Sequence, residues 1–312
     1  MNMADNKPLV SIGMPVCNGE RFIQQALDSL LAQDYKHFEL IISDNASADR
    51  TADICKSYAT KDARVRYYRN ETNLDIVANF NRVFELSSGE YFMWAACDDL
   101  WEPSYIKTLL EYLITTPSAV LAFSAFDNID ERHHQVRTYP HLFELPSEDL
   151  FTRLQNYITQ EEWLGKANLI YGLMRRTAVQ EAGGLKIWGR SLWGIDMLVV
   201  FKLLTLGNLV LSPDLLFHKR LLLSQTGLSH WTISQARSGY QQLHGYFAGY
   251  ASIISTLDSL DFKHKMLLKA ALRRRSRQVY LREIKKAIVS LGSRWVITRG
   301  KYLRCNSCNR GV

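Results

Sequence analysis

Two adjacent acids, Asp98 and Asp99, stand at the end of an apolar stretch of the chain. Residues 91–97 carry no charge, and such a run is typical of a strand buried on both faces. In an open α/β sheet, ligands bind beyond the carboxyl ends of the strands. Neighbouring carboxylates repel each other unless they are neutralised, which a divalent cation with oxygen ligands can do. The pair is therefore a candidate metal site; the alternative is that it begins the next helix, near Trp101.

Three strand-and-helix units precede these acids and predict the sheet that positions them. Residues 9–16 form the first expected strand, and the turn at Asn18 and Gly19 leads into a helix. Residues 38–43 and 65–69 are the next two strands, each followed by a helical pattern. This alternation predicts a parallel sheet with helices on both faces, whose loops after the strands share one rim. The side chains expected to converge on that rim are Asp44, Asn73, Asp98 and Asp99.

The composition is that of an ordinary globular protein, with 47% hydrophobic and 22% charged residues. Residues 261–312 hold 15 Lys and Arg against 2 acids, whereas residues 1–260 hold 23 against 29. A basic tail points to an anionic partner, either nucleic acid or a membrane surface. No apolar run reaches about 18 residues, and the N-terminus lacks the apolar core of a signal peptide, so we expect a cytoplasmic protein.

Several common sites are not supported by the sequence. Five cysteines, an odd number, suit a reducing compartment better than a disulfide framework. Cys305 and Cys308 have zinc-like spacing, but a structural zinc site needs four ligands and no second pair is present. The turn between Gly13 and Gly19 lacks the G-x-G-x-x-G pattern, and no Walker loop occurs. The patterns therefore favour neither a dinucleotide-dependent enzyme nor a P-loop protein.

Four short motifs follow one another at residues 15–20, 43–47, 69–73 and 97–99. In this order they resemble the motifs of the family 2 glycosyltransferases, which have the GT-A fold. The resemblance covers residues 9 to 230 and implies an α/β, Rossmann-related, mostly parallel sheet with helices on both faces, plus a C-terminal helical extension. We therefore expect a glycosyltransferase domain over 1–232, with a nucleotide-sugar half (9–100) and an acceptor half (101–232), and a basic helical region over 233–312. Further similarity to the family lies at residues 175–184 and 193–196.

The resemblance also implies roles on the donor side. Asp98 and Asp99 stand at the family's D-x-D site, one acid near the ribose and one on Mg²⁺ or Mn²⁺, with Ala96 in place of the usual first acid. Asp44 resembles the carboxylate that accepts a hydrogen bond from the nucleobase imide, which favours a UDP or dTDP donor; its alternative role is in a turn. The other donor-binding candidates are Pro15, Val16, Glu20, Asn73 and Asn81.

Asp196 is the candidate catalytic base. It precedes an apolar helical run and resembles the second acid of the family's Glu-Asp pair, whose first acid is replaced by Ile195. A carboxylate that takes the proton of the acceptor hydroxyl contributes ~10²–10⁴-fold to the rate. Direct attack by that hydroxyl, with no covalent intermediate, inverts the anomeric configuration. The alternative role, an N-cap of the helix, is compatible with catalysis.

Two further groups of residues have both a structural and a functional interpretation. His218, Lys219 and Arg220 could hold the departing diphosphate or form a solvated basic loop. Three tryptophans of the acceptor half could stack on sugars or belong to the core. They are Trp163, Trp188 and Trp193.

Beyond residue 233 the pattern changes to long helices. One apolar face is predicted to pack on the catalytic domain, and residues 261–304 interleave apolar and basic positions like an interfacial amphipathic helix. We favour an anionic membrane surface over nucleic acid, because an enzyme with a lipid-linked acceptor works at a membrane. The packing face is Tyr240, Leu243, Tyr246, Phe247, Tyr250, Ile253 and Ile254; the basic residues are Lys269, Arg273, Arg274, Arg275, Arg277, Arg282, Lys285 and Lys286.

These observations predict an inverting, metal-dependent glycosyltransferase that uses a nucleotide-sugar donor. Its acceptor is a saccharide or a lipid-linked saccharide in cell-surface polysaccharide synthesis, and its place is the cytoplasm, peripheral to the inner face of the plasma membrane. Two alternatives stay open. A sugar nucleotidyltransferase would need a Gly-rich, basic loop where residues 17–20 stand, and a non-catalytic sugar-binding or scaffold relative would explain the missing acids at Ala96 and Ile195.

Overall fold

The first half of the chain alternates strands and helices, as the sequence predicts. The computed structural model describes residues 7–139, 142, 144–188, 191–222 and 233–303, with side chains given for 239–285 in the last two helices. Every residue of the first two strands is buried, and the first helix buries one apolar face on them. The elements are β1 (Val10–Val16), α1 (Ile23–Leu31), β2 (Phe38–Asp44), α2 (Thr51–Lys61), β3 (Val65–Arg69), α3 (Ile76–Glu85) and β4 (Tyr91–Trp94).

The fourth strand is shorter than the predicted 91–97. Its last ladder partner on β1 is Gly13, whose carbonyl also accepts a hydrogen bond from the Ala95 amide at 2.9 Å. The chain then leaves β1, so residues 14–16 remain paired with β2 alone. The two acids therefore lie in the turn that leads to β5 (Leu100–Trp101), at the rim of the sheet.

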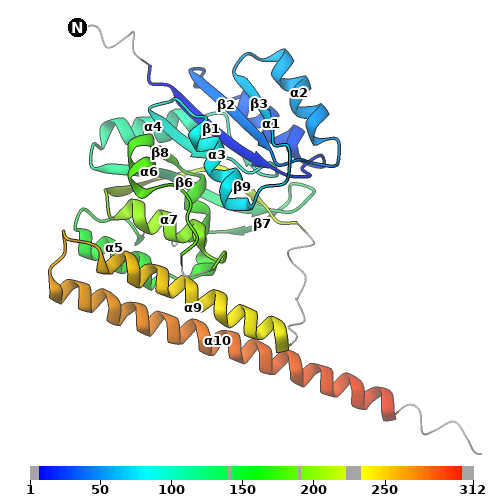
Figure 1. Ribbon diagram of the computed structural model, residues 1–312, viewed down its shortest axis with the longest axis vertical. Helices are drawn as coiled ribbons and strands as arrows, with labels where there is room; N and C mark the ends of the chain where they lie inside the picture. Colours follow the sequence, from blue (N-terminus) through cyan, green and yellow to red (C-terminus); the bar gives the residue numbers. More distant parts are fainter. Residues whose placement is uncertain (1–6, 140–141, 143, 189–190, 223–232, 304–312) are drawn as a thin grey trace, which may run out of the picture.

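The strands of the described residues join one sheet of nine, in the order β3-β2-β1-β4-β8-β6-β9-β5, with β7 beside β6 (Figure 1). β1 to β4 pair in parallel and so do β6 and β9, whereas β5, β7 and β8 are antiparallel to their neighbours. The mostly parallel α/β sheet is thus confirmed. The remaining elements of this unit are α4 (Tyr105–Thr115), β6 (Ala119–Ile129), β7 (Gln135–Thr138), α5 (Leu150–Thr159), η2 (Glu162–Leu164), η3 (Lys166–Tyr171), β8 (Leu173–Arg175), α6 (Arg176–Ala182), α7 (Ile195–Leu204) and β9 (Asn208–Arg220).

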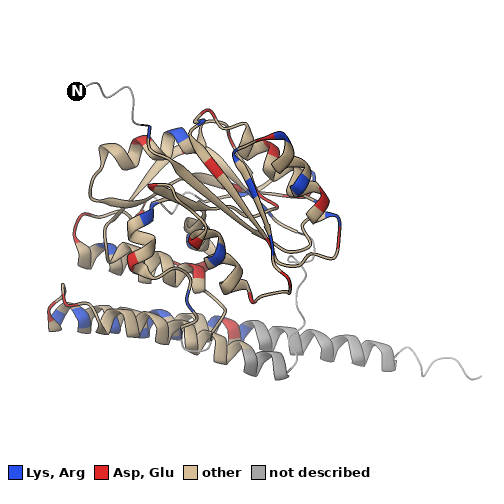
Figure 2. Cartoon of the chain, turned by 45° about the horizontal axis from the view of Figure 1, so that its top comes forward, with Lys and Arg blue, Asp and Glu red and all other residues tan. Residues whose placement is uncertain are grey.

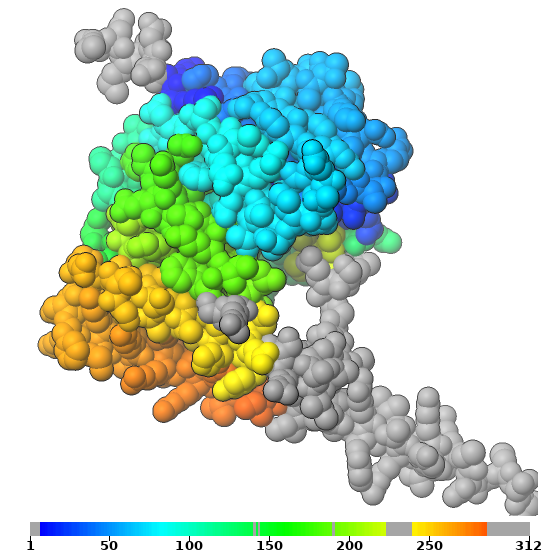
Figure 3. All heavy atoms as spheres, viewed as in Figure 1, coloured from blue at the N-terminus to red at the C-terminus, as the bar shows by residue number. Residues whose placement is uncertain are grey.

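Two long helices, α9 (Ile233–Ser255) and α10 (Phe262–Leu303), lie side by side next to α5 and α7 (Figures 1 and 3). α9 packs on α7, and α10 packs on α5 and α9. The predicted packing face of α9 is confirmed at six of its positions, from Leu243 to Ile254, because all six side chains are buried; Tyr240 is the exception and is 59% exposed. One apolar core runs from β1 to Val279 of α10.

The amphipathic pattern of 261–304 differs from the expected lipid-facing one. Leu268, Leu272 and Arg275 are buried, because that side of α10 lies against α5 and α9 instead of lipid. Among the described helices, none is both long enough and apolar enough to span a bilayer. The pair Cys305 and Cys308 and the side chain of Lys286 lie outside the described part.

Candidate active site

The loop after β1 is fastened to the loop after β2. Pro15 and Val16, both buried, are in ladder register with Ser43 and Asp44, so the two strands end together. Asn18 has a left-handed backbone (φ 53°), a conformation that Asn tolerates, and its amide donates to Ser47 Oγ at 2.9 Å. The exposed Glu20 accepts a hydrogen bond from the Arg50 amide at 2.9 Å, at the start of α2.

Asp44 is fully buried at the end of β2. Its carboxylate accepts hydrogen bonds from the Ser47 amide at 2.9 Å, the Tyr67 hydroxyl at 2.7 Å and Arg69 Nη1 at 2.7 Å. Burial alone would raise the pKa of Asp44, but the hydrogen bonds from Ser47 and Tyr67 and the charge of Arg69 outweigh it and lower that pKa below its usual value. Asp44 is therefore an ionised carboxylate whose oxygens are engaged by the protein itself.

Asn73 lies where it was expected, and Asn81 does not face the same loop. Asn73 accepts a hydrogen bond from Asn45 Nδ2 at 3.0 Å and donates to Cys17 Sγ at 3.5 Å, so it joins the loops after β1, β2 and β3. Asn81 instead binds the backbone of Leu185, accepting from its amide and donating to its carbonyl, both at 2.9 Å. Its side chain therefore links α3 to the acceptor half.

Asp98 lines a cavity of about 520 Å³, named here the small cavity. Its walls come from the loop after β1, the turn after β4 and Glu131. The carbonyl of Asp98 accepts from Arg220 Nε at 2.8 Å, and its partly exposed carboxylate makes no hydrogen bond or ion pair within the described residues. A carboxylate that opens on a cavity in this way is free to accept a ligand.

Asp99 has the opposite surroundings. It is fully buried, and its two oxygens accept from Lys219 Nζ at 3.0 Å and from the Arg220 amide at 2.9 Å. Burial raises the pKa of Asp99 to about 6, against the opposing charge of Lys219. Burial lowers the pKa of Lys219, but Asp99, Tyr171 and Asp98 together raise that pKa by more and keep the ammonium protonated. The two acids of the turn are thus one open carboxylate and one buried ion pair.

The basic segment 218–220 is the end of β9 and is not a solvated loop. His218 bonds to Asp127 Oδ1 at 2.8 Å, and Arg220, which is fully buried, stacks 4.5 Å from the centre of the Phe22 ring. With Lys219 on Asp99, all three basic groups hold the rim of the sheet together. The hydrogen-bond partners of these three residues are 90 to 200 positions away in the chain. The charge pattern of the segment alone could therefore not reveal these contacts.

Asp196 stands in the first turn of α7, after Gly194, whose φ of +77° is left-handed. Its Oδ1 accepts from the Met197 amide at 2.7 Å, but the N-cap position of α7 is Gly194 and has no side-chain cap hydrogen bond, so the alternative role of Asp196 as the N-cap is wrong. Burial raises the pKa of Asp196 to about 6, and the hydrogen bond from Met197 and the charges of Lys219 and Lys166 partly oppose it. A carboxylate with a pKa near the working pH is suited to general base catalysis.

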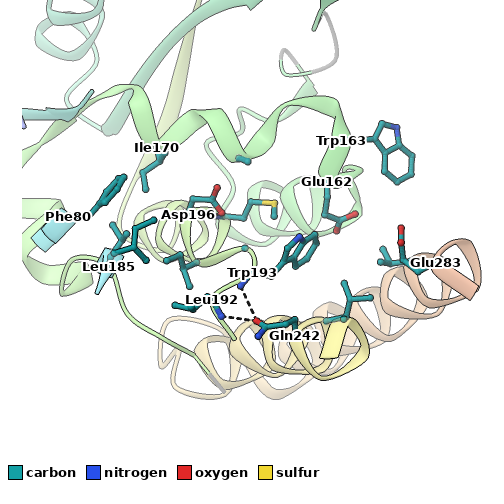
Figure 4. A pocket seen from close by; sticks show the side chains of 18 of the residues that line it. Phe80, Glu162, Trp163, Ile170, Leu185, Leu192, Trp193, Asp196, Gln242 and Glu283 are labelled. Carbon is teal, nitrogen blue, oxygen red and sulfur yellow. Dashed lines mark hydrogen bonds between the residues drawn. The ribbon is translucent and has the colours of Figure 1, made fainter. Parts of the chain in front are cut away.

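Asp196 lines a second cavity of about 1040 Å³, named here the large cavity. Figure 4 shows Asp196 near its middle, with Phe80 and Leu185 at one end and Trp163 and Glu283 at the other. Trp163 and Trp193 line it, whereas Trp188 packs against the core. Two of the three predicted tryptophans therefore face space that a ligand can enter.

Few side chains of the described residues are placed to bind a divalent cation. No group of three or more His, Cys, Asp or Glu side chains forms a metal cluster within the described ranges. Mg²⁺ is commonly held by one or two carboxylates together with the phosphates of a substrate, and Asp98 fits such a site. The carboxylate of Asp99 is already neutralised by Lys219.

Solved structures share this fold. S. aureus TarS in complex with UDP-GlcNAc superimposes with a TM-score of 0.63 over 91% of this chain and 80% of that chain, at 18% identity. The mannosyltransferase PcManGT from Pyrobaculum calidifontis, in complex with GDP-Man and Mn²⁺, gives a TM-score of 0.59 over 97% and 82%, at 13% identity. At these identities the matches show the fold, which is GT-A-like with a C-terminal helical region.

The sequence relatives are more similar in sequence to this chain than the solved structures are, but their matches cover less of it. An uncharacterised glycosyltransferase of Rickettsia typhi is 35% identical over 41% of this chain and 40% of its own length. TuaG of Bacillus subtilis, named for teichuronic acid biosynthesis, is 31% identical over 40% and 49%. The matched part is thus less than half of either relative.

A match to a family model shows the family of this chain. The model of glycosyl transferase family 2 matches residues 11–178, which is more than half of the chain and includes the loops after β1, β2, β3 and β4. The chain therefore belongs to glycosyl transferase family 2.

Proposed function

We propose that this chain is an inverting glycosyltransferase that moves a sugar from a nucleotide diphosphate sugar to a saccharide or lipid-linked saccharide. The observation that carries the proposal is the contrast between two carboxylates: Asp98, which opens on the small cavity, and Asp196, whose pKa is raised to about 6 in the wall of the large cavity. One is suited to the donor and the other to the acceptor hydroxyl. Membership of family 2 supports the same reaction.

On the donor side, the joined loops after β1, β2 and β3 form the nucleotide site in this proposal, with Pro15, Val16, Glu20 and Asn73 along it. Asp44 acts there through Tyr67 and Arg69, the groups that its carboxylate holds. A UDP or dTDP donor is favoured; TarS has been solved with UDP and with UDP-GlcNAc, and PcManGT with GDP-Man.

Asp98 is the residue that would hold Mg²⁺ or Mn²⁺ together with the donor phosphates. Such an ion, when bound, offsets the negative charge that grows on the diphosphate as the sugar leaves. PcManGT was solved with Mn²⁺, which supports a metal in this fold. Lys219 and Asp99 lie beside Asp98 and keep the turn rigid.

Asp196 takes the proton of the acceptor hydroxyl as that oxygen attacks the anomeric carbon. With a pKa of about 6 it is ionised at neutral pH yet basic enough to accept a proton. The new bond forms on the face opposite the departing nucleotide, so the anomeric configuration inverts. The name of the relative TuaG supports a role in cell-surface polysaccharide synthesis.

We also propose that the outer face of α10 rests on an anionic membrane, at the inner face of the plasma membrane. Between Lys263 and Lys285 the exposed stripe of this helix carries basic and apolar side chains and the uncharged Gln278, but no acid. Basic residues recur along the described part of α10 in Figure 2. The stripe comprises Lys263, Met266, Leu267, Ala270, Arg273, Arg274, Arg277, Gln278, Leu281, Ile284 and Lys285.

The transfer reaction is tested by a screen of nucleotide sugars for binding and for slow hydrolysis, with and without Mn²⁺. We expect UDP or dTDP sugars to bind, and Asp196→Asn to keep that affinity while it lowers kcat by ~10²–10⁴-fold. Donor binding without any turnover, by native protein and by Asp196→Asn alike, would instead favour a non-catalytic sugar-binding relative.

A further inference from the structure

The large cavity is mostly apolar, which is unusual for a site that takes only a sugar. Aliphatic and aromatic side chains of α3, η3, the loop before α7, α9 and α10 form its walls, among them Ile76, Phe80, Ile170, Leu192 and Leu243. A saccharide presents hydroxyl groups, each of which costs free energy when it is buried without a hydrogen-bond partner. Apolar walls instead favour a ligand that brings apolar surface with it.

The same cavity is in contact with the reaction centre. Asp196 lines it, and so does Tyr171, whose ring centre lies 5.1 Å from the Lys219 ammonium that pairs with Asp99. Figure 4 shows apolar side chains such as Phe80, Leu185 and Ile170 around the Asp196 carboxylate. A ligand in this cavity therefore meets one proton acceptor at its centre and apolar surface on either side.

The far end of the cavity is closed by α10. Val279, Arg282 and Glu283 line it, and the Arg282 guanidinium lies 3.2 Å from the centre of the Trp163 ring. One turn before Val279, Arg275 makes a buried ion pair with Glu162, which fixes this helix against η2. The helix that walls the cavity on one side exposes the basic and apolar stripe on the other, so α10 stands between the cavity and the surface proposed to face lipid.

We propose that the large cavity holds the hydrocarbon chain of an amphiphilic acceptor, next to the hydroxyl that Asp196 deprotonates. This inference rests on the proposed function and names its acceptor class: a sugar or other alcohol joined to a flexible alkyl or prenyl chain. The volume of the large cavity, about 1040 Å³, is at the upper end of the ~300–1,000 Å³ usual for small-molecule pockets. The cavity therefore has room for more than the sugar alone.

The test measures chain-length dependence on the full-length protein. Methyl, butyl and octyl β-D-glucoside, each below its critical micelle concentration, are titrated by calorimetry, with phenyl β-D-glucoside as the aromatic counterpart. Each methylene that enters the cavity should tighten binding by about fourfold, from the transfer free energy of a buried CH₂. Equal affinity for all three alkyl glucosides, or tighter binding of the phenyl compound than of the octyl one, would overturn the proposal.

Two variants locate the effect. Leu192→Asp puts a charge on the cavity wall at a side chain that is 50% exposed, and Ile114→Asp does the same on α4, away from the cavity, at 50% exposure. We expect Leu192→Asp to weaken octyl glucoside binding at least tenfold and Ile114→Asp to leave it unchanged. Ala167→Phe, which fills the cavity with no new charge, should act like Leu192→Asp. Equal losses in Leu192→Asp and Ile114→Asp would contradict the assignment.

Donor binding is measured on the same samples, so the two proposals fail separately. UDP-sugar turnover without chain-length dependence would overturn the acceptor inference alone. Chain-length dependence without donor binding or turnover would leave a lipid-binding cavity and overturn the proposed transfer reaction.

Discussion

Asp98 and Asp99 are neighbours in the chain, yet their carboxylates differ in burial and in their partners. Asp99 is fully buried, and the ammonium of Lys219 neutralises its carboxylate inside the protein. The carboxylate of Asp98 instead opens on the small cavity. Removing one member of a buried ion pair leaves the other charge uncompensated, which typically costs ~3–5 kcal/mol. Removing an open carboxylate costs little stability. The two acids can therefore be separated by experiment.

We predict that Asp98→Asn keeps the melting temperature of the native protein and loses the Mn²⁺-dependent part of UDP binding. Asp99→Asn should instead lower the free energy of unfolding by about 3 kcal/mol, because Lys219 is left without its partner. Calorimetry with UDP and Mn²⁺, together with thermal melts, measures both effects.

The control is Asp99→Asn combined with Lys219→Met, which removes both charges and should restore most of the lost stability. If Asp98→Asn were as destabilising as Asp99→Asn, or if Asp98→Asn bound UDP and Mn²⁺ normally, the division of roles between the two acids would be wrong.

If Asp196 is the catalytic base, as proposed, Asp196 and Lys166 set the pH range of the reaction. Asp196 must be ionised to act as a base, and its pKa is raised to about 6, chiefly by burial. Activity should therefore rise with pH through about 6 and level off above 7. Lys166 is buried among Tyr157, Gln160 and Glu162, and its positive charge lowers the pKa of Asp196.

We predict that Lys166→Met moves the acid limb of the kcat profile to higher pH, because the carboxylate of Asp196 loses a charge that favours its ionised form. The pKa of Lys166 itself is lowered by burial to about 8, so the difference between native and variant should fade above that pH. A profile measured from pH 5 to 9 decides the matter. An unshifted acid limb would mean that Lys166 does not act on Asp196.

At the level of residues, the sequence predicted where acids stand but not what they touch. Asp98, Asp99 and Asp196 were found from their places beside apolar runs, since strand ends and helix starts can be read locally. The partners of Asp44 and Asp99 lie on other strands, and Lys219 is 120 positions from Asp99. No local pattern carries such pairings, so the burial of both carboxylates could only come from the fold.

Among the elements, α7 fixes the direction of Asp196. It is apolar on nearly all sides and buried, and it begins directly after Gly194, which has a φ of +77°. A Cβ on Gly194 would lie 2.5 Å from the Tyr246 ring of α9. The glycine thus permits both the left-handed turn and the close approach of α9 to the start of α7, where Asp196 lies.

We predict that Gly194→Ala destabilises the protein by about 1–3 kcal/mol, through backbone strain and the clash with Tyr246, and lowers kcat by displacing Asp196. Gly183→Ala is the matched control, because its φ is +81° but its Cβ would meet only the flexible end of Lys186. It should lose stability without losing kcat per folded molecule. Equal losses of kcat in both variants would show that α7 is not positioned by this turn.

The elements up to β4 were predictable because β1, β2 and β4 are short, largely apolar runs, and turn residues follow β1, β2 and β3. The elements between β5 and α9 were not, apart from the helix that contains Asp196. β8 has only three residues, and β5 has two, so neither carries a readable period. They are held in place by longer neighbours: β8 lies between β4 and β6, and β5 pairs with β9.

At the scale of the whole molecule, the C-terminal helices belong to the core as well as to the surface. Leu268, Leu272 and Val279 of α10 are buried in the same apolar cluster as β1. Burying such side chains contributes about 1.5–3 kcal/mol each, a large share of the ~5–15 kcal/mol by which domains are stable. The sequence predicted the helices and the packing face of α9, but it read the apolar positions of α10 as lipid-facing, because periodicity cannot tell one apolar partner from another.

The outer stripe of α10 leads to the last prediction. Replacing Arg273, Arg274 and Arg277 by Glu reverses three exposed charges without touching the buried Arg275. Each basic group near an anionic surface contributes about 1 kcal/mol, so the triple variant should stop co-sedimenting with anionic vesicles that the native protein binds, and the binding of the native protein should weaken as salt is raised.

Reversing Lys56, Lys61 and Lys107, which lie on α2 and α4, changes the net charge equally and should leave vesicle binding intact. If both triple variants lost binding alike, net charge and not this stripe would attract the protein; if the native protein ignored anionic vesicles but bound nucleic acid with steep salt dependence, the stripe would serve that partner instead.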